Sequence, residues 1–149
     1  MKKIFLICFC LVSLCTTGLC KNIHTATMSK DWNLICQNPS GTYYYEAFTL
    51  VPKNTPPKDI VILETKVAGY FTKDDFKPAN MVVMEVLLNT TENTYNITHI
   101  QLLEEKQGKV IKKEKVKQKF YLVPKNTFMA DLMEKAHGFV KTAQGNEVK

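Results

Sequence analysis

The chain has 149 residues, of which 45% are apolar, so it is large enough for one ordinary globular domain. All twenty of its basic residues are lysine, and its formal net charge is +6. Because specific contacts to bases and phosphates rely on the arginine guanidinium, this composition argues against a nucleic-acid partner and favours anionic polysaccharides, lipid headgroups or acidic protein surfaces.

Residues 1–20 have the pattern of an export signal. A short basic start precedes an apolar run from Ile4 to Leu14, and a polar exit ends at Cys20. The apolar run is shorter than the about 20 residues that a membrane-spanning helix needs. We therefore predict a signal peptide over residues 1–20 and a product exported to the periplasm, the outer-membrane surface or the medium. Its removal takes away Lys2 and Lys3 and no acid, so the formal net charge would fall from +6 to +4.

Four of the five cysteines lie in this signal, and only Cys36 lies in the body of the chain. Leu19-Cys20 approximates the lipobox of bacterial lipoproteins, so a lipid anchor on Cys20 is an alternative to a soluble exported product. Cys36 lies in an apolar run and is expected to be a small buried hydrophobe. An intermolecular disulfide and a reactive thiol are the alternatives for it.

After a flexible lead over residues 21–30, the body of the chain reads as a series of strands. We expect strands at Trp32–Cys36, at Thr42–Val51, at Asp59–Phe71 with a bend at Gly69, and at Met81–Asn89. The last of these is the most apolar run of the mature chain, which predicts the central strand of the sheet. Pro56 and Pro57 place a loop before the third strand.

The stretch from Tyr95 to Val140 predicts a hairpin and then a helix. Residues 96–103 alternate apolar and polar side chains, Gln107-Gly108 supplies a tight turn, and Lys109 to Val123 forms the second arm. By parity, one face of this arm carries a row of lysines and the other carries Val116, Phe120 and Leu122.

Pro124 ends the second arm, and a helix follows it. Asn126 or Thr127 can cap this helix, and its apolar face is formed by Met129, Leu132, Met133, Ala136 and Val140. Gly138 is a natural residue for its C-terminal end. We expect a single α+β domain over residues 31–140, with about six mostly antiparallel strands and one C-terminal helix packed on a face, and a disordered tail over residues 141–149.

The sequence holds no recognisable catalytic, cofactor or metal site. The three histidines, His24, His99 and His137, lie on separate elements without metal-ligand spacing. The acidic pairs Asp74-Asp75 and Glu104-Glu105 are adjacent in sequence, so their side chains should point apart instead of converging. We therefore predict a protein that is not an enzyme and binds no cofactor.

The most specific surface feature is the lysine row on the second arm of the hairpin. Lys113, Lys115, Lys117 and Lys119 would stand about 7 Å apart on one face of a strand, a spacing comparable to repeated anionic groups on a polysaccharide. The alternative is that lysines on an exposed edge strand only prevent sheet-to-sheet aggregation.

Two segments match the acceptor pattern for N-linked glycosylation, Asn89-Thr90-Thr91 and Asn96-Ile97-Thr98. A eukaryotic secreted protein would use them, and a bacterial one would not.

Several features together resemble the bacterial surface-adhesin protein E-like family. They are Trp32, Thr42-Tyr43-Tyr44-Tyr45, Gln107-Gly108-Lys109-Val110-Ile111 and Val123-Pro124-Lys125-Asn126-Thr127, whose order covers most of the mature chain. The resemblance implies a six-stranded antiparallel sheet with a C-terminal helix, export, and, as in the named adhesin, binding to host matrix and plasma proteins such as laminin and vitronectin. Family members commonly join the strand before the hairpin to the helix by a disulfide, whereas the positions near Asn89 and Gly138 hold no cysteine here.

These features predict an exported bacterial surface or periplasmic binding protein. Its candidate partners are a host matrix protein or an anionic polysaccharide, and it would meet a membrane only through an anchor on Cys20; the oligomeric state is open and a homodimer is compatible. Two alternatives stand beside this one: a periplasmic envelope component of structural role without a host ligand, and a secreted eukaryotic glycoprotein.

Overall fold

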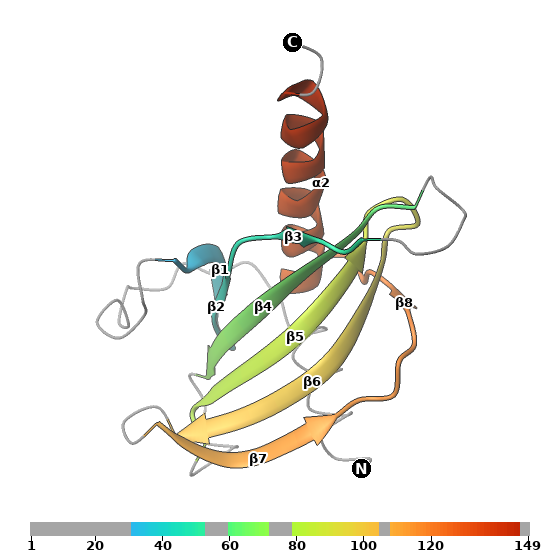
Figure 1. Ribbon diagram of the computed structural model, residues 1–149. Helices are drawn as coiled ribbons and strands as arrows, with labels where there is room; N and C mark the ends of the chain where they lie inside the picture. The colour runs from blue at the N-terminus through green and yellow to red at the C-terminus, as the bar shows by residue number, and fades with distance from the viewer. Residues whose placement is uncertain (1–30, 53–59, 72–78, 105–107, 147–149) are drawn as a thin grey trace.

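The computed structural model describes residues 31–52, 60–71, 79–104 and 108–146, with side chains described as far as residue 144. The expected signal peptide, Cys20 and the expected lead over residues 21–30 lie outside these ranges. The described chain forms eight strands and a C-terminal helix, α2 (Figure 1). The strands are β1 (Asn33–Asn38), β2 (Gly41–Tyr45), β3 (Thr49–Leu50), β4 (Ile62–Phe71), β5 (Met81–Asn89), β6 (Thr94–Glu104), β7 (Lys109–Lys115) and β8 (Tyr121–Leu122), and α2 spans Phe128–Asn146.

All strand pairs are antiparallel, and the main path of the sheet is β1-β2-β4-β5-β6-β7. The strand Met81–Asn89 lies between β4 and β6, inside the sheet as we expected from its apolar run. The short strands β3 and β8 pair with β4 and β6 beside this path. The predicted α+β class, an antiparallel sheet with a C-terminal helix, is confirmed.

The sheet has eight strands instead of about six because two expected strands are each divided. The first contains β2 and β3, which pair with different parts of β4 and are separated by residues 46–48. The second contains β7 and β8, which pair with different parts of β6 and are separated by residues 116–120. In both places the chain leaves the ladder and returns to the same neighbouring strand.

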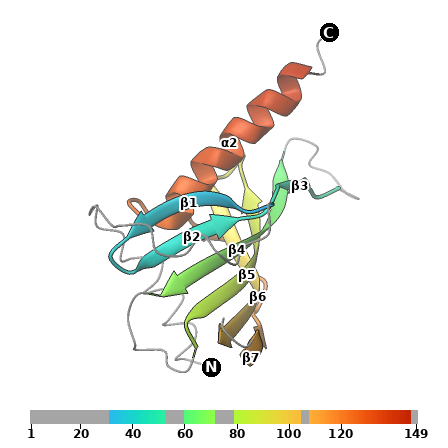
Figure 2. The same ribbon diagram turned by 90° about the vertical axis from the view of Figure 1, so that its left-hand side faces the viewer.

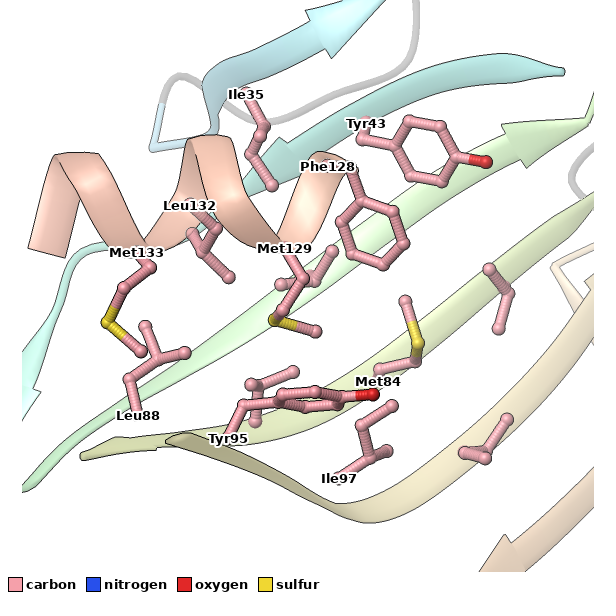
Figure 3. Close-up of a cluster of buried hydrophobic side chains, with 14 of the residues drawn as sticks. Ile35, Tyr43, Met84, Leu88, Tyr95, Ile97, Phe128, Met129, Leu132 and Met133 are labelled. Carbon is pink, nitrogen blue, oxygen red and sulfur yellow. The ribbon is translucent and has the colours of Figure 1, made fainter. Parts of the chain in front are cut away.

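The core lies between one face of the sheet and α2 (Figure 3). Alternate residues of the central strands point to the helix, as the period of two in a strand requires. Buried residues of this set include Val67, Val82, Met84, Val86, Leu88, Tyr95, Ile97 and Ile100. The helix contributes Phe128, Met129, Leu132, Met133 and Ala136, whose spacing of three and four residues forms one apolar stripe. The expected core face of the helix is thereby confirmed, with Phe128 added to it.

The start of α2 is fixed by a capping residue. Asn126 has a positive φ of 57°, which turns the chain after Pro124, and the Oγ1 of Thr127 accepts a hydrogen bond from the Ala130 backbone N–H at 3.3 Å. The same hydroxyl donates to the Pro124 carbonyl at 2.8 Å. Of the two expected caps, Thr127 fills the role.

The end of α2 differs from the expectation. Gly138 lies inside the helix, which continues to Asn146, so the ordered domain does not stop at residue 140 and residues 141–146 are not a disordered tail. A glycine inside a helix costs roughly 1 kcal/mol relative to alanine, which a long helix of good helix formers can tolerate. The C-terminal part of α2 projects beyond the strands (Figures 1 and 2).

Candidate binding surface

Strand β7 and the segment after it carry the predicted lysines. β7 lies at the end of the strand order, with β6 as its neighbour, and at the far side of the sheet from α2 (Figures 1 and 2). Lys113, Lys115, Lys117 and Lys119 are all exposed. We call the exposed lysines between residues 109 and 119 the lysine edge: Lys109, Lys112, Lys113, Lys115, Lys117 and Lys119.

The strand register places two of the predicted lysines on the face of the sheet opposite to the helix. Lys113 pairs with Gln101 and Lys115 pairs with His99, and directly paired residues share a face. Lys112 pairs with Leu102, a core residue, so its side chain is on the helix-facing side. The lysine edge therefore presents ammonium groups on both faces of β7.

Lys115 ends a row of ionisable side chains that runs across four strands. Successive pairings join Lys66 to Glu85, Glu85 to His99 and His99 to Lys115. Within this row the Nδ1 atom of His99 lies 2.5 Å from a Glu85 carboxylate oxygen. The carboxylate of Glu85 is therefore engaged by His99, which leaves Lys115 facing solvent at the margin of the sheet.

Lys117 and Lys119 do not continue a regular strand. Five residues, 116–120, stand opposite three residues of β6 between the Lys115–His99 and Tyr121–Tyr95 pairs, so the chain bulges. The backbone N–H of Lys119 bonds to the Asn96 side-chain Oδ1 at 3.4 Å, and its Nζ lies 5.3 Å from the Tyr121 ring centroid. The expected row of four evenly spaced lysines on one strand is thus wrong: two lie on β7 and two on the bulge.

The apolar side of the expected arm is changed by the same bulge. Val116 is half-buried and packs against the core, as parity predicted. Phe120 and Leu122 are instead 38% and 77% exposed. Parity fails after Val116 because the chain leaves the ladder at residues 116–120 and returns with Tyr121 paired to the core residue Tyr95, so that Tyr121 packs against the core and its neighbours Phe120 and Leu122 point the other way.

Charge is segregated within the described ranges. Seven of the ten lysines there lie between residues 109 and 125, namely the six of the lysine edge and Lys125. Only one of the nine acidic residues in those ranges, Glu114, lies in the same segment, and its carboxylate is 2.8 Å from the Lys112 ammonium. The segment therefore carries seven positive charges against one negative charge.

The histidines and acidic pairs weighed in the sequence do not form a site among the described residues. In the parts of the chain that the structure describes, no three His, Cys, Asp or Glu side chains come together as metal ligands. His137 lies on α2 and lines an open hollow of about 520 Å³ with Asn93, Met133 and Lys141 among others. His24, Asp74, Asp75 and Glu105 lie outside the described residues.

Both asparagines of the glycosylation pattern are buried, with 4% and 2% exposure for Asn89 and Asn96. The Oδ1 of Asn89 accepts hydrogen bonds from the backbone N–H groups of Thr91 and Glu92, and its Nδ2 donates to the Glu92 carboxylate at 3.0 Å. A glycan on either Nδ2 would need space that the folded domain does not offer. This geometry disfavours the glycoprotein alternative.

Cys36 pairs with Tyr43 across the β1–β2 hairpin, is half-buried and packs against the core cluster. This position agrees with a small structural hydrophobe. Within residues 31–146, apart from the gaps in the description, no helix is both long enough and apolar enough to cross a bilayer.

Three comparisons with known proteins leave the family open. No family model, no curated protein and no solved structure matches this chain. The resemblance to the adhesin protein E-like family therefore stays a prediction.

Proposed function

We propose that this chain is an exported binding protein without catalytic activity, and that its lysine edge holds an anionic macromolecule. The observation that carries the proposal is the charge segregation. The lysines gather at one margin of the sheet, while the acids of the described ranges lie almost entirely elsewhere.

The affinity of such a surface for a polyanion depends on how many ammonium groups contact the polyanion at once. A single exposed ion pair contributes about 0–1 kcal/mol, which is too little for binding. Six ammonium groups along one edge can contact a polyanion together, and they raise its rate of encounter by electrostatic attraction. Since these contacts are exposed, salt should weaken them strongly.

The position of the lysine edge leaves it accessible. It lies at the margin of the sheet away from α2, so the helix does not compete with a ligand for it (Figures 1 and 2). Glu114 is the single acid within it and is already paired with Lys112. A polyanion would therefore meet little repulsion there.

The export part of the proposal rests on the sequence of residues 1–20, and the adhesin-like part rests on the family resemblance. Both point to a protein that meets macromolecules outside the cytoplasm, where sulfated or carboxylated polysaccharides and acidic matrix proteins occur. The alternative of a structural envelope component without a ligand predicts no specific retention on a polyanion.

A heparin column tests the proposal. Lys113, Lys115, Lys117 and Lys119 are changed together to glutamate, and a control protein carries the same change at Lys66, Lys125, Lys135 and Lys141. Both variants lose the same net charge, but only the first loses the lysine edge. We expect the unchanged protein and the control to elute at higher salt than the edge variant; equal elution of the two variants would show that only net charge matters.

A further inference from the structure

β7 is an outer strand whose second side has no strand partner among the described residues. It is seven residues long, and every side chain on it except that of Glu114 is exposed, including Val110 at 48% and Ile111 at 36%. An outer strand of this kind carries backbone N–H and C=O groups that can bond to a further strand.

The register identifies which of these backbone groups point outward. The Val116 N–H donates to the Thr98 carbonyl at 2.8 Å, so residues 116 and 98 form a hydrogen-bonded pair. Hydrogen-bonded and non-hydrogen-bonded pairs alternate along an antiparallel ladder. Lys113 and Lys115 therefore form non-hydrogen-bonded pairs with β6. The backbone N–H and C=O groups of these two residues point away from β6, toward the open edge of the sheet.

The side chains select the charge of an incoming strand. Lys113 and Lys115 are two residues apart on the face of the sheet opposite to α2. Side chains of a strand added beside β7 would stand next to them on the same face. A second copy of β7 would place lysine against lysine and be repelled. An acidic strand would be attracted.

We propose that an extended acidic segment of a partner polypeptide adds to β7 as a further strand. Its backbone bonds to Lys113 and Lys115, and acidic side chains at alternate positions stand opposite these two lysines. This inference rests on the proposed function and narrows its anionic partner to a polypeptide in extended conformation. If the lysines only guard the edge against aggregation, β7 accepts no strand of any charge.

The probe is a fluorescein-labelled synthetic peptide in which glutamate alternates with valine. Its matched control has the same side chains but methylated backbone nitrogens, which keep the charge and remove the backbone donors. We expect the first peptide to bind at least tenfold more tightly than the control. In amide hydrogen exchange on the unmodified protein, the Lys113 and Lys115 amides should become at least tenfold slower in exchange when the first peptide is bound.

Lys113→Pro removes one outward donor without touching a bond to β6, and Lys113→Gln is its control for lost charge. Peptide binding should be weaker in the proline variant than in the glutamine variant, with both variants checked for folding by thermal unfolding. Equal binding of the two peptides, or binding without slower exchange at Lys113 and Lys115, overturns strand addition. If the unmodified protein is retained on heparin but does not bind the peptide, strand addition is wrong and the proposed function still stands. If it neither is retained on heparin nor binds the peptide, both proposals are wrong.

Discussion

At the scale of single residues, close packing decides what a glycine does in this fold. We expected Gly69 to bend its strand, but it pairs regularly with Tyr43 on one side and Val82 on the other. A Cβ atom at Gly69 would lie 2.9 Å from two ring carbons of Tyr43. That ring is fully buried and stacks on Phe128 with centroids 4.5 Å apart. Gly69 therefore makes room for the aromatic contact that joins the sheet to α2.

Gly69→Ala should destabilise the protein by roughly 1–3 kcal/mol, because the added methyl group forces the Tyr43 ring to move in a packed core. Gly138→Ala is the matched control. It lies in the helix, where the new Cβ would meet nothing within 4 Å apart from its chain neighbours and the adjacent helix backbone, and the change should stabilise the protein by roughly 0.4–1 kcal/mol. Urea unfolding measures both. An unchanged free energy of unfolding in Gly69→Ala would mean that the Tyr43 ring is not tightly packed.

At the scale of elements, the N-terminal part of α2 packs on the sheet and its C-terminal part is exposed to solvent. Its first turns bury Phe128, Met129, Leu132 and Met133, whereas residues 141–144 are exposed. The packing energy of the helix should therefore lie almost wholly in its N-terminal part.

Leu132→Ala should reduce the free energy of unfolding by roughly 2–5 kcal/mol, since Leu132 is fully buried and its loss leaves a cavity. Thr142→Ala on the same helix removes only an exposed hydrogen bond to the Gly138 carbonyl, and should change it by about 0.5 kcal/mol or less. Both values come from urea unfolding. Similar losses in the two variants would contradict the division of the helix.

Some of the strands and helix boundaries could be predicted from the sequence, and others could not. The alternation of residues 96–103 predicted β6, and the apolar runs at Asp59–Phe71 and Met81–Asn89 predicted β4 and β5, because burial in the core selects these residues. The break between β7 and β8 was not predictable from the arm alone, since the partner of the Lys119 amide is the side chain of Asn96 on another strand. Gly138 predicts a helix end, but α2 continues to Asn146 because the helix formers on both sides outweigh the low helix propensity of one glycine.

At the scale of the whole molecule, the helix and the lysine edge occupy different sides of one sheet. α2 lies near β1 and β2, and β7 lies at the opposite end of the sheet (Figures 1 and 2), where the exposed lysines gather. The excess of lysines over acids between residues 109 and 125 can be counted in the sequence, whereas the place of this segment at an outer strand depends on strand order, which no local pattern contains. Binding at β7 should therefore leave the core and α2 undisturbed.

Amide-resolved NMR with an added heparin oligosaccharide tests the central claim most directly, because it locates the contact instead of reporting only that one exists. We predict concentration-dependent shifts at residues 109–119 and at their β6 partners, with the buried residues of α2 unchanged, and loss of these shifts at high salt. Shifts gathered instead around Asn93, Met133 and His137, or an unperturbed β7 at saturating ligand, would contradict the assignment of the lysine edge as the binding surface.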